Sequence, residues 1–410
     1  MNLKKQAIIN TSGNMVYFIA LWILTVITTN VLGYEAVGTL TLAMAIGNVI
    51  AMIQMYGVRS FQSSDISFRY SPRDYLKARA LTVVVGWGIG IITCIALGYS
   101  GKTMAAVMGF VLVKTSESFS DALFGNDQRL GHLEYAGCSM IGRGIILVII
   151  FSLGISLLKD LNVGLFLVGV GLLILSIAVD FPLHQRIIKN HNPFLDKGIG
   201  GILKECFPLL IAVLIPVAIN AIPRVVLERY YGAEMLGYYG NVSTPGLLLT
   251  AVVPTVLTAI MPVYGDAVEK HDFCRIQKVW IKSMVGVVVL TGICVMGALL
   301  IGRPLLAFVY TNAIISYVDY LYFILISMLF YTLTMCNNCV LIALRKNWEL
   351  SLFSGIALVV CVPSSAVMVK NWGIYGAIAS LAIPFFVQIL IQSVYIIGLL
   401  RKRENCNLEI

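Results

Sequence analysis

Charge is scarce in this chain. Only 12% of its 410 residues are Asp, Glu, Lys or Arg, whereas 59% are Ala, Val, Ile, Leu, Met, Phe, Trp, Tyr or Cys. Soluble domains carry about 25% charged residues, so this composition excludes a soluble globular protein, and its hydrophobicity excludes a disordered chain. The apolar runs are continuous rather than alternating, which is untypical of a membrane β-barrel. We therefore expect an all-α, polytopic membrane protein.

Sequence signals of catalysis are also missing. The chain contains no P-loop, no HExxH, no GxSxG and no Rossmann glycine fingerprint, which excludes ATP hydrolysis by this chain and the commonest enzyme classes. Its four His have no ligand-like spacing, and most of its nine Cys lie within apolar runs, where they read as small embedded residues. We expect no enzyme activity, no cofactor and no metal site.

Twelve apolar stretches are long enough to cross a bilayer, since a spanning helix takes about 20 residues. The first begins directly after the basic N-terminal residues, so we expect no cleaved signal peptide. The stretches cover residues 13–33, 37–57, 80–100, 104–124, 138–158, 161–181, 206–227, 242–264, 283–302, 316–341, 351–369 and 374–400, with ends uncertain by several residues.

The net charge of +9 has a topological explanation. With the N-terminus inside, 22 of the 29 Lys and Arg are assigned to inner segments and five to outer ones, and the other two, Lys114 and Arg224, lie within spans. The 22 include Arg143, which lies near the inner end of the stretch 138–158. Cytoplasmic loops of membrane proteins collect Lys and Arg, so both termini are predicted to be cytoplasmic, and we expect no nucleic-acid partner. The mixed-charge inner loop 58–79 is interpreted as a solvated face or a contact with lipid headgroups.

The chain divides into two similar halves. We predict an N-terminal six-helix lobe over 1–181, a polar cytoplasmic linker over 182–205 and a C-terminal six-helix lobe over 206–410. Gly33, Glu35 and Gly38 align with Gly232, Glu234 and Gly237 at a constant offset of 199, and a Tyr-Gly pair closes the second span of each half, at 56–57 and 264–265. Because the two copies have the same orientation, this is a parallel repeat, which suits alternating access.

The fourth span carries an unusual charged stripe. Lys114, Glu117 and Asp121 fall within an arc of about 60° on one helix face. A charge at mid-bilayer costs roughly 2.5–3.5 kcal/mol, so this face should meet protein or a water-filled cavity. Two interpretations stay open: a polar substrate or ion site, or a structural salt bridge between Lys114 and Glu117, with Asp121 near the cytoplasmic interface.

Two arginines are candidate phosphate ligands. Arg224 follows Pro223 in the seventh span, where Pro208 and Pro216 also disturb the helix and free carbonyl groups toward a cavity. A guanidinium binds phosphate bidentately, although Arg224 could equally snorkel to the interface. Arg59 closes the second span and could bind phosphate at the cytoplasmic mouth or anchor the helix there.

Several stretches resemble the oligosaccharide flippases of the Wzx type, within the multidrug/oligosaccharidyl-lipid/polysaccharide exporter superfamily. The resemblance covers almost the whole chain, and the glycine turns are shared with multidrug exporters. The stretches that carry it are LKKQAIINTSGNMVYFIALWI, VLGYEAVG, RSFQSSDISFRYSPRDYLKAR, KTSESFSDALFGNDQRLGHLEYAGCSMIGRG, NAIPRVVLERYYGAEMLGYY and GIYGAIAS.

The resemblance implies a two-lobed, twelve-helix flippase in the bacterial cytoplasmic membrane. It would move undecaprenyl-diphosphate-linked oligosaccharide from the inner to the outer leaflet for capsule or other surface polysaccharide. Arg59, Lys114 and Arg224 match the family's cationic positions and would bind substrate, whereas Glu117 and Asp121 could carry a coupling proton or sodium ion. The alternative is an ion-coupled multidrug exporter of the same superfamily. A membrane enzyme is less favoured, because the outer loops are too short to form a catalytic segment.

Overall fold

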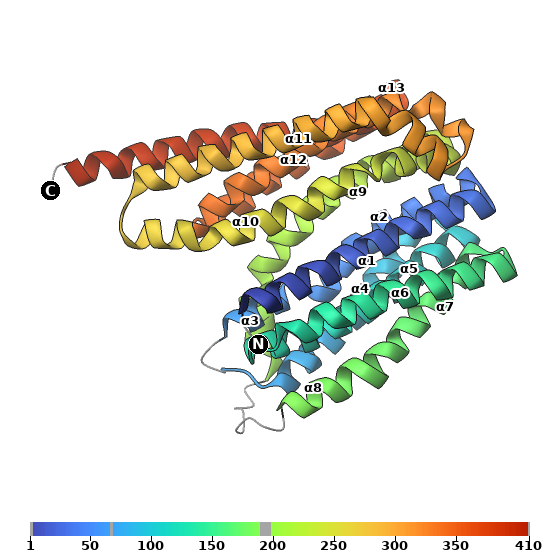
Figure 1. Ribbon diagram of the computed structural model, residues 1–410, viewed down its shortest axis with the longest axis horizontal. Coiled ribbons are helices and arrows are strands. Elements are labelled where there is room, and N and C mark those ends of the chain that lie inside the picture. The colour runs from blue at the N-terminus through green and yellow to red at the C-terminus, as the bar shows by residue number, and fades with distance from the viewer. Residues whose placement is uncertain (1–2, 66–68, 189–197, 409–410) are drawn as a thin grey trace. The chain divides into compact units, whose positions relative to one another are not determined.

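The computed structural model describes residues 3–65, 69–188 and 198–408, and these residues form helices and short connections with no β-strand among them. Two compact units divide the chain, unit 1 over Met1–Val217 and unit 2 over Ala218–Ile410. Figure 1 shows their helices coloured along the chain. The all-α fold predicted from the composition is confirmed.

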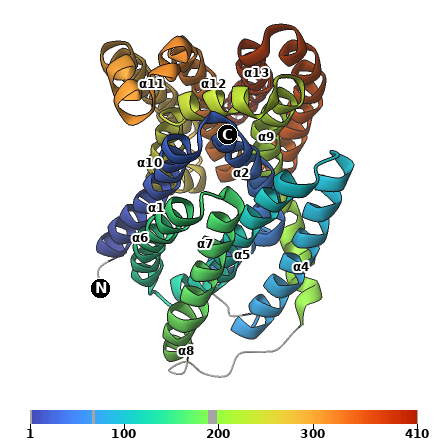
Figure 2. The ribbon, with the colours of Figure 1, turned by 90° about the vertical axis from the view of Figure 1, so that its right-hand side faces the viewer.

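Unit 1 is a bundle whose central member is the helix with the charged stripe. Its elements are α1 (Leu3–Leu32), α2 (Tyr34–Met55), α3 (Val58–Ser64), α4 (Pro72–Ala96), α5 (Gly101–Arg129), α6 (Leu133–Leu158), α7 (Leu161–Leu175), the π-helix η1 (Ser176–Asp180) and α8 (Phe181–Ile188). Helix α5 packs against α2, α4 and α7, which surround it in Figure 2. The charges of α5 therefore face protein, as their cost in lipid requires.

Helices α1 and α6 pack in backbone contact. A Cβ atom added at Gly13 would lie 2.2 Å from the carbonyl oxygen of Gly137, and one added at Gly137 would lie 2.5 Å from the carbonyl oxygen of Ile9. Small residues allow this close approach between membrane helices. The contact sets the positions of Tyr17 on α1 and Arg143 on α6, whose side chains reach charged groups of the bundle.

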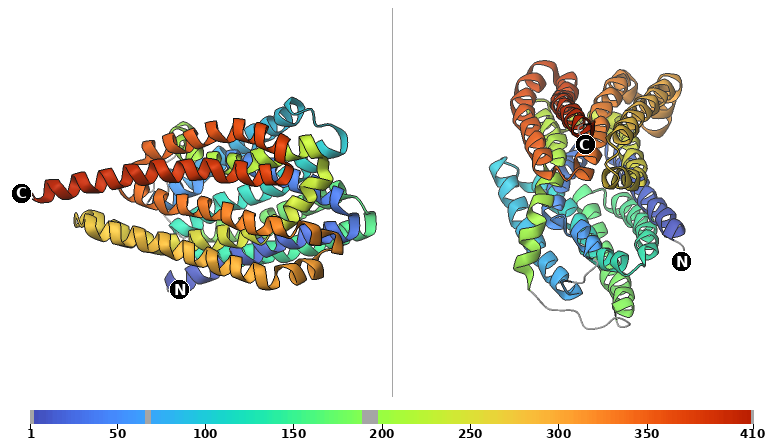
Figure 3. Two further views of the ribbon diagram at one scale, coloured as in Figure 1. Left: turned by 90° about the horizontal axis from the view of Figure 1, so that it is seen from above. Right: turned by 90° about the vertical axis from the view of Figure 1, so that its left-hand side faces the viewer.

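Unit 2 contains most of the long helices. Helix α9 (Ile199–Ser243) enters it from unit 1, and α10 (Gly246–Glu269), α11 (Phe273–Val309), the 3-10 helix η2 (Asn312–Tyr317), α12 (Asp319–Ala343) and α13 (Asn347–Leu408) follow. Helix α9 is broken at Gly232 and α13 at Gly373. Figure 3 shows α11 and the second arm of α13 as long rods beside α12.

The predicted number of spans agrees with this fold. Within the described ranges, nine helices are long and apolar enough to cross a membrane. Three more spans come from other helices. They are the charged helix α5, helix α10 together with the second arm of α9, and the second arm of α13. Figure 1 follows these helices in order along the chain.

Several predicted loops are helical instead. The outer loop expected at 228–241 is helix apart from Gly232, and the inner loop expected at 265–282 lies mostly within α10 and α11. In the loop expected at 58–79, α3 occupies the beginning and α4 starts at Pro72 behind a capping box formed by Ser71 and Asp74. Polar residues such as Glu, Lys and Arg propagate a helix into water, so hydropathy alone predicts helices that are too short.

The two aligned glycines share one backbone conformation. Gly33 has φ 86° and ψ −178°, and Gly232 has φ 81° and ψ 172°, a region that essentially only glycine occupies. Each ends the first span of its half, which supports the repeat. The two Tyr-Gly pairs, by contrast, differ in backbone conformation. Tyr56 and Gly57 have left-handed conformations between α2 and α3, whereas the pair at 264–265 lies inside α10.

The lobe limits stay a prediction. The expected linker at 182–205 begins within α8, its residues 189–197 lie outside the described part, and α9 starts at Ile199. Cys336 and Cys339 have a CxxC spacing on α12, and both are free thiols packed among apolar side chains.

Candidate functional site

The predicted pair on α5 is present. The Lys114 Nζ atom lies 2.9 Å from both carboxylate oxygens of Glu117, and the two side chains are only 9% and 11% exposed. The Tyr17 hydroxyl of α1 donates a hydrogen bond to Glu117, and the rings of Tyr17 and Phe110 flank the Lys114 ammonium. Lys114 is therefore neutralised within its own helix, as the structural interpretation expected, and its role toward substrate stays a prediction.

The third charge of the stripe, Asp121, binds two arginines. Its carboxylate lies 3.3 Å from the guanidinium of Arg59 and 3.0 Å from that of Arg79. Arg79, whose side chain is 1% exposed, also donates to the carbonyl of Gln54 and to the Ser118 hydroxyl. Two guanidinium groups share one carboxylate, so this cluster of α3, α4 and α5 carries a net positive charge.

The interpretation of 58–79 as a solvated loop was therefore wrong for some of its charges. Arg79 lies within α4 and turns inward because Asp121 and the Gln54 carbonyl accept its hydrogen bonds. Asp65 and Asp74 are likewise buried. A buried arginine keeps its charge only where acceptors replace water, and these acceptors lie on other helices.

A second buried ion pair was not predicted. Arg143 of α6 lies 3.1 Å from Asp180, which ends the π-helix η1, and both side chains are buried. Four serine hydroxyls add hydrogen bonds to the pair; they belong to Ser116, Ser120, Ser139 and Ser176. Counting Arg143 as an inner-loop cation was wrong, because it lies inside α6 and faces the bundle.

A third buried pair joins α5 to α8. The Nδ1 atom of His184 lies 2.7 Å from the Asp127 carboxylate, and both residues are buried. The prediction that His184 belongs to a polar linker was wrong. It turns inward because Asp127 on the last turns of α5 offers it a partner.

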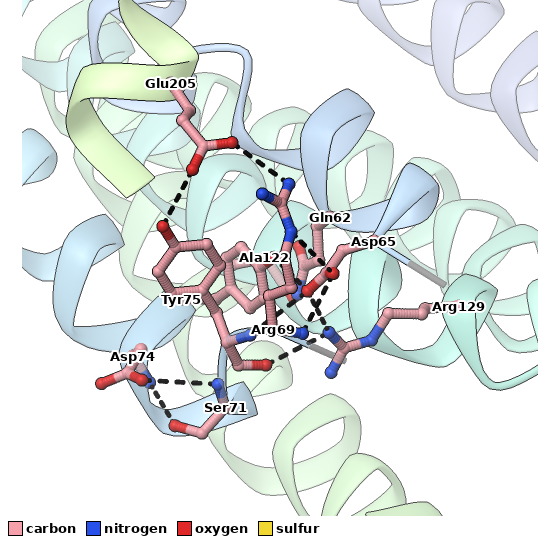
Figure 4. A network of polar contacts seen from close by, with 10 residues as sticks. Gln62, Asp65, Arg69, Ser71, Asp74, Tyr75, Ala122, Arg129 and Glu205 are labelled. Atoms are coloured by element: carbon pink, nitrogen blue, oxygen red, sulfur yellow. Dashed lines mark hydrogen bonds and ion pairs between the residues drawn. The ribbon is translucent and has the colours of Figure 1, made fainter. Parts of the chain in front are cut away.

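The loop before α4 is held by one carboxylate, Asp65 (Figure 4). It accepts hydrogen bonds from the backbone N–H groups of Arg69 and Tyr70, from the Tyr75 hydroxyl and from the Arg129 guanidinium at 3.1 Å. Burial by itself would raise the pKa of Asp65, but these donors and the Arg129 charge lower it below its ordinary value. Arg69 and Tyr70, which precede α4, are thus fixed to α4 and α5.

This loop also reaches the start of α9. The Arg69 guanidinium lies 3.1 Å from the Glu205 carboxylate, to which the Tyr70 hydroxyl also donates. Ile202 and Cys206 of α9 pack in the same apolar cluster as Tyr75. The first turns of α9 therefore belong to unit 1.

Arg224 of α9 has a different environment, within unit 2. It is half-buried, its guanidinium carbon lies 5.9 Å from the centre of the Tyr239 ring, and it forms no ion pair with a described residue. Its buried Nε–H has no hydrogen-bond acceptor in the described part of the chain. In unit 1 the interior charges are paired: Glu117, Asp121, Asp127 and Asp180 each lie next to a basic side chain. Arg224 has no such partner among the described residues and can still donate hydrogen bonds to a ligand.

Unit 2 also has an apolar groove between α10 and α11, with a volume of about 460 Å³. Aliphatic side chains line it, including Val256, Ile260 and Leu290, and Lys282 and Ser283 are its polar members. Such a surface suits a hydrocarbon chain with a polar end.

No family model matches this chain. It is 24% identical over 344 residues to the capsular polysaccharide biosynthesis protein CapF of Staphylococcus aureus, an alignment that covers 78% of this chain and 81% of that protein.

Solved structures of transporters share its fold. The MATE multidrug transporter DinF-BH superposes with a TM-score of 0.70 at 14% identity, covering 97% of this chain and 95% of that one. An inward-facing multidrug resistance MATE family transporter of the MOP superfamily gives 0.70 at 15% identity, over 97% and 99% of the two chains. A Pyrococcus furiosus MOP superfamily transporter, described as having a binding pocket of reverse polarity, gives 0.64 at 14% identity, over 97% and 95%. The resemblance predicted from the sequence is confirmed: this multi-pass membrane protein has the fold of the MOP superfamily transporters.

Proposed function

We propose that this protein is a flippase that moves undecaprenyl-diphosphate-linked oligosaccharide from the inner to the outer leaflet of the bacterial cytoplasmic membrane by alternating access, for surface polysaccharide synthesis. The observation that carries the proposal is electrostatic: the interior carboxylates of unit 1 are paired with bases, whereas Arg224 of unit 2 has no acidic partner among the described residues. The similarity to a protein named for capsular polysaccharide biosynthesis supports it.

A diphosphate headgroup would satisfy Arg224. The guanidinium can bind two phosphate oxygens at once, and its buried Nε–H lacks an acceptor within the described residues. Arg59 is a second candidate, since it shares Asp121 with Arg79 and the cluster retains positive charge. Lys114 would bind the headgroup only if a phosphate oxygen replaced the Glu117 carboxylate as its ion-pair partner.

The lipid tail need not cross the protein. It can stay in hydrocarbon while the headgroup moves, and the groove between α10 and α11 offers it an apolar surface. Lys282 stands at the same groove and could meet a lipid phosphate.

Transport requires a driving force, and the sequence contains no P-loop. Glu117 and Asp121 are the proposed ion-coupling residues: protonation of Glu117 would release Lys114, and protonation of Asp121 would release Arg59. A transport rate that is independent of both proton and sodium gradients would reject this coupling.

The alternative is an ion-coupled multidrug exporter, favoured by the names of the structural neighbours. An exporter of cationic drugs needs carboxylates that are free to meet the drug. The interior carboxylates of unit 1 are instead held by Lys114, Arg59, Arg79, Arg143 and His184.

The test is the sidedness of lipid-linked oligosaccharide in cells. Deleting the gene should leave the lipid at the inner leaflet, and the wild-type gene should restore its outer exposure. Arg224→Ala should reduce restoration by about tenfold or more, because a charge-assisted hydrogen bond contributes about 1.5–3 kcal/mol. Arg224→Lys keeps the charge but not the bidentate geometry, so its effect should be intermediate.

Arg303→Ala is the matched control, since Arg303 is an exposed arginine of the same unit. It should restore sidedness like wild type. Unchanged sidedness on deletion, together with altered drug tolerance, would reject the flippase and favour the exporter.

A further inference from the structure

Five aromatic rings form a continuous cluster within unit 2, which we name the tyrosine platform: Tyr238, Tyr317, Tyr320, Phe323 and Tyr375. Tyr238 and Tyr317 stack with ring centres 4.1 Å apart and planes 11° from parallel. Tyr320 lies 6.1 Å from Tyr317 and 4.5 Å from Tyr375, which meets Phe323 edge to face at 5.4 Å. Four separate segments supply these rings, so the cluster depends on the folded unit.

The backbone breaks of unit 2 put these rings at one end of its helices. Tyr238 lies on the arm of α9 that follows Gly232, and Tyr375 lies on the arm of α13 that follows Gly373. Tyr317 ends η2, between α11 and α12, and Tyr320 near the start of α12 lies against Tyr375, two residues after the break in α13. In the predicted topology this is the outer end.

The platform is partly exposed at the surface of unit 2 and is chemically amphipathic. Tyr375 is 46% exposed and Phe323 48% exposed, and the hydroxyls of Tyr317, Tyr320 and Tyr375 donate no hydrogen bond to a described residue. Carboxylates flank the rings: Glu234 accepts a hydrogen bond from Tyr238, and Asp319 precedes Tyr320 at the start of α12. Both carboxylates are accessible to solvent.

We infer that the tyrosine platform binds sugar rings of the transported glycan at the outer end of unit 2. The C–H face of a pyranose packs on an aromatic face, and the phenols and carboxylates offer hydrogen bonds to sugar hydroxyls. This inference rests on the proposed flippase function and adds a glycan subsite distinct from the phosphate ligand Arg224.

A lipid-interface belt is the rival explanation, because Tyr and Trp gather at membrane surfaces. Belt residues meet the headgroup region one by one. Here the rings stack on one another across four segments, and Glu234 and Asp319 would repel anionic headgroups. These features favour an uncharged, hydroxyl-rich ligand.

The experiment compares two probes in proteoliposomes that contain the full-length protein. One probe is a polyprenyl diphosphate that carries a single N-acetylglucosamine, and the other is the same carrier with chitotetraose; a lectin outside the vesicles reports translocation. Tyr317→Leu and Tyr375→Leu should slow the tetrasaccharide probe by about fivefold and leave the single-sugar probe within twofold of wild type. Tyr375→Phe keeps the ring and should retain most of the tetrasaccharide rate.

Phe308→Leu is the matched control. Phe308 is an exposed aromatic residue near the same end of α11 and is outside the platform, so both probes should move at the wild-type rate. An equal loss for both probes in the Tyr→Leu variants, or no loss for either, would overturn the platform.

Failure of the flippase itself gives a different result. If wild-type protein moves neither probe, the proposed function is wrong, and saturation-transfer NMR of free chitotetraose on the purified protein then decides the platform. If chitotetraose binds the wild-type protein but not a Tyr317→Leu/Tyr375→Leu double variant, the glycan subsite at the tyrosine platform is supported. If it does not bind the wild-type protein, the subsite is rejected.

Discussion

Removing the Lys114 ammonium should destabilise unit 1 strongly. Lys114→Ala leaves the Glu117 carboxylate, 11% exposed, without the cation that lies 2.9 Å away. Breaking one partner of a buried pair costs about 3–5 kcal/mol. We expect the lower end, about 3 kcal/mol, because Tyr17 still donates its hydrogen bond to Glu117.

Neutralising both partners should recover most of that loss. In Lys114→Ala/Glu117→Gln no charge remains buried at this pair, and the side-chain carbonyl of the introduced glutamine can accept the Tyr17 hydrogen bond. A coupling energy of about 2 kcal/mol or more is expected, in the range found for contacting residues. Glu117→Gln alone leaves Lys114 with a neutral acceptor and should cost less than Lys114→Ala.

The assay measures stability and transport on the same variants. Thermal unfolding of purified protein in detergent gives the first, and sidedness of lipid-linked oligosaccharide in cells gives the second. A double variant that is stable but does not transport would show that the pair acts in transport, through Lys114 as a substrate ligand or through Glu117 as a coupling residue. Recovery of both properties would make the pair structural, and a Lys114→Ala protein as stable as wild type would refute the reasoning from burial.

Three further predictions concern the paired glycines Gly33 and Gly232 and two buried carboxylates. Gly33→Ala and Gly232→Ala should each destabilise the protein by about 1–3 kcal/mol, because a φ near +80° with extended ψ suits only glycine. Thermal unfolding should show similar losses of stability for both variants. Gly88→Ala is the control and should lose no stability, because its added Cβ meets open space at a helical position. The stability that ionised Asp65 contributes should be complete above its unfolded pKa of about 3.9 and lost as the pH falls through its lower folded pKa, so unfolding of wild type and Asp65→Asn should converge in acid and differ at neutral pH. Asp180→Asn should destabilise by about 3 kcal/mol by leaving buried Arg143 unpaired, and Asp180→Asn/Arg143→Met should unfold at a higher temperature than Asp180→Asn alone.

The helices could be predicted because apolar content and helix length are local properties of the sequence. The same holds for the pair of Lys114 and Glu117, since residues three apart in a helix are neighbours. Gly33 and Gly232 were visible as a match at one offset, and their shared conformation explains why glycine stands at both positions. Most predicted helices were too short, because hydropathy marks the lipid-embedded part alone.

The other ion pairs depend on residues far apart in the chain. Arg79 meets Asp121 across 42 positions, Arg143 meets Asp180 across 37, and His184 meets Asp127 across 57. The count of inner Lys and Arg residues treats both Arg79 and Arg143 as loop residues. Only the packing of α4, α6 and α8 around α5 shows that their charges are matched by partners inside the bundle.

That difference between paired and unpaired charge separates the two units. In a low-dielectric interior, a paired charge has little capacity left for a ligand, whereas an unpaired one gains most from a ligand of opposite sign. Lys114 and Arg143 belong to the first kind, because carboxylates hold them. Arg224 belongs to the second, because it forms no ion pair with a carboxylate among the described residues. Substituting Arg224 should therefore weaken transport more than it weakens folding, and substituting Arg143 should do the reverse.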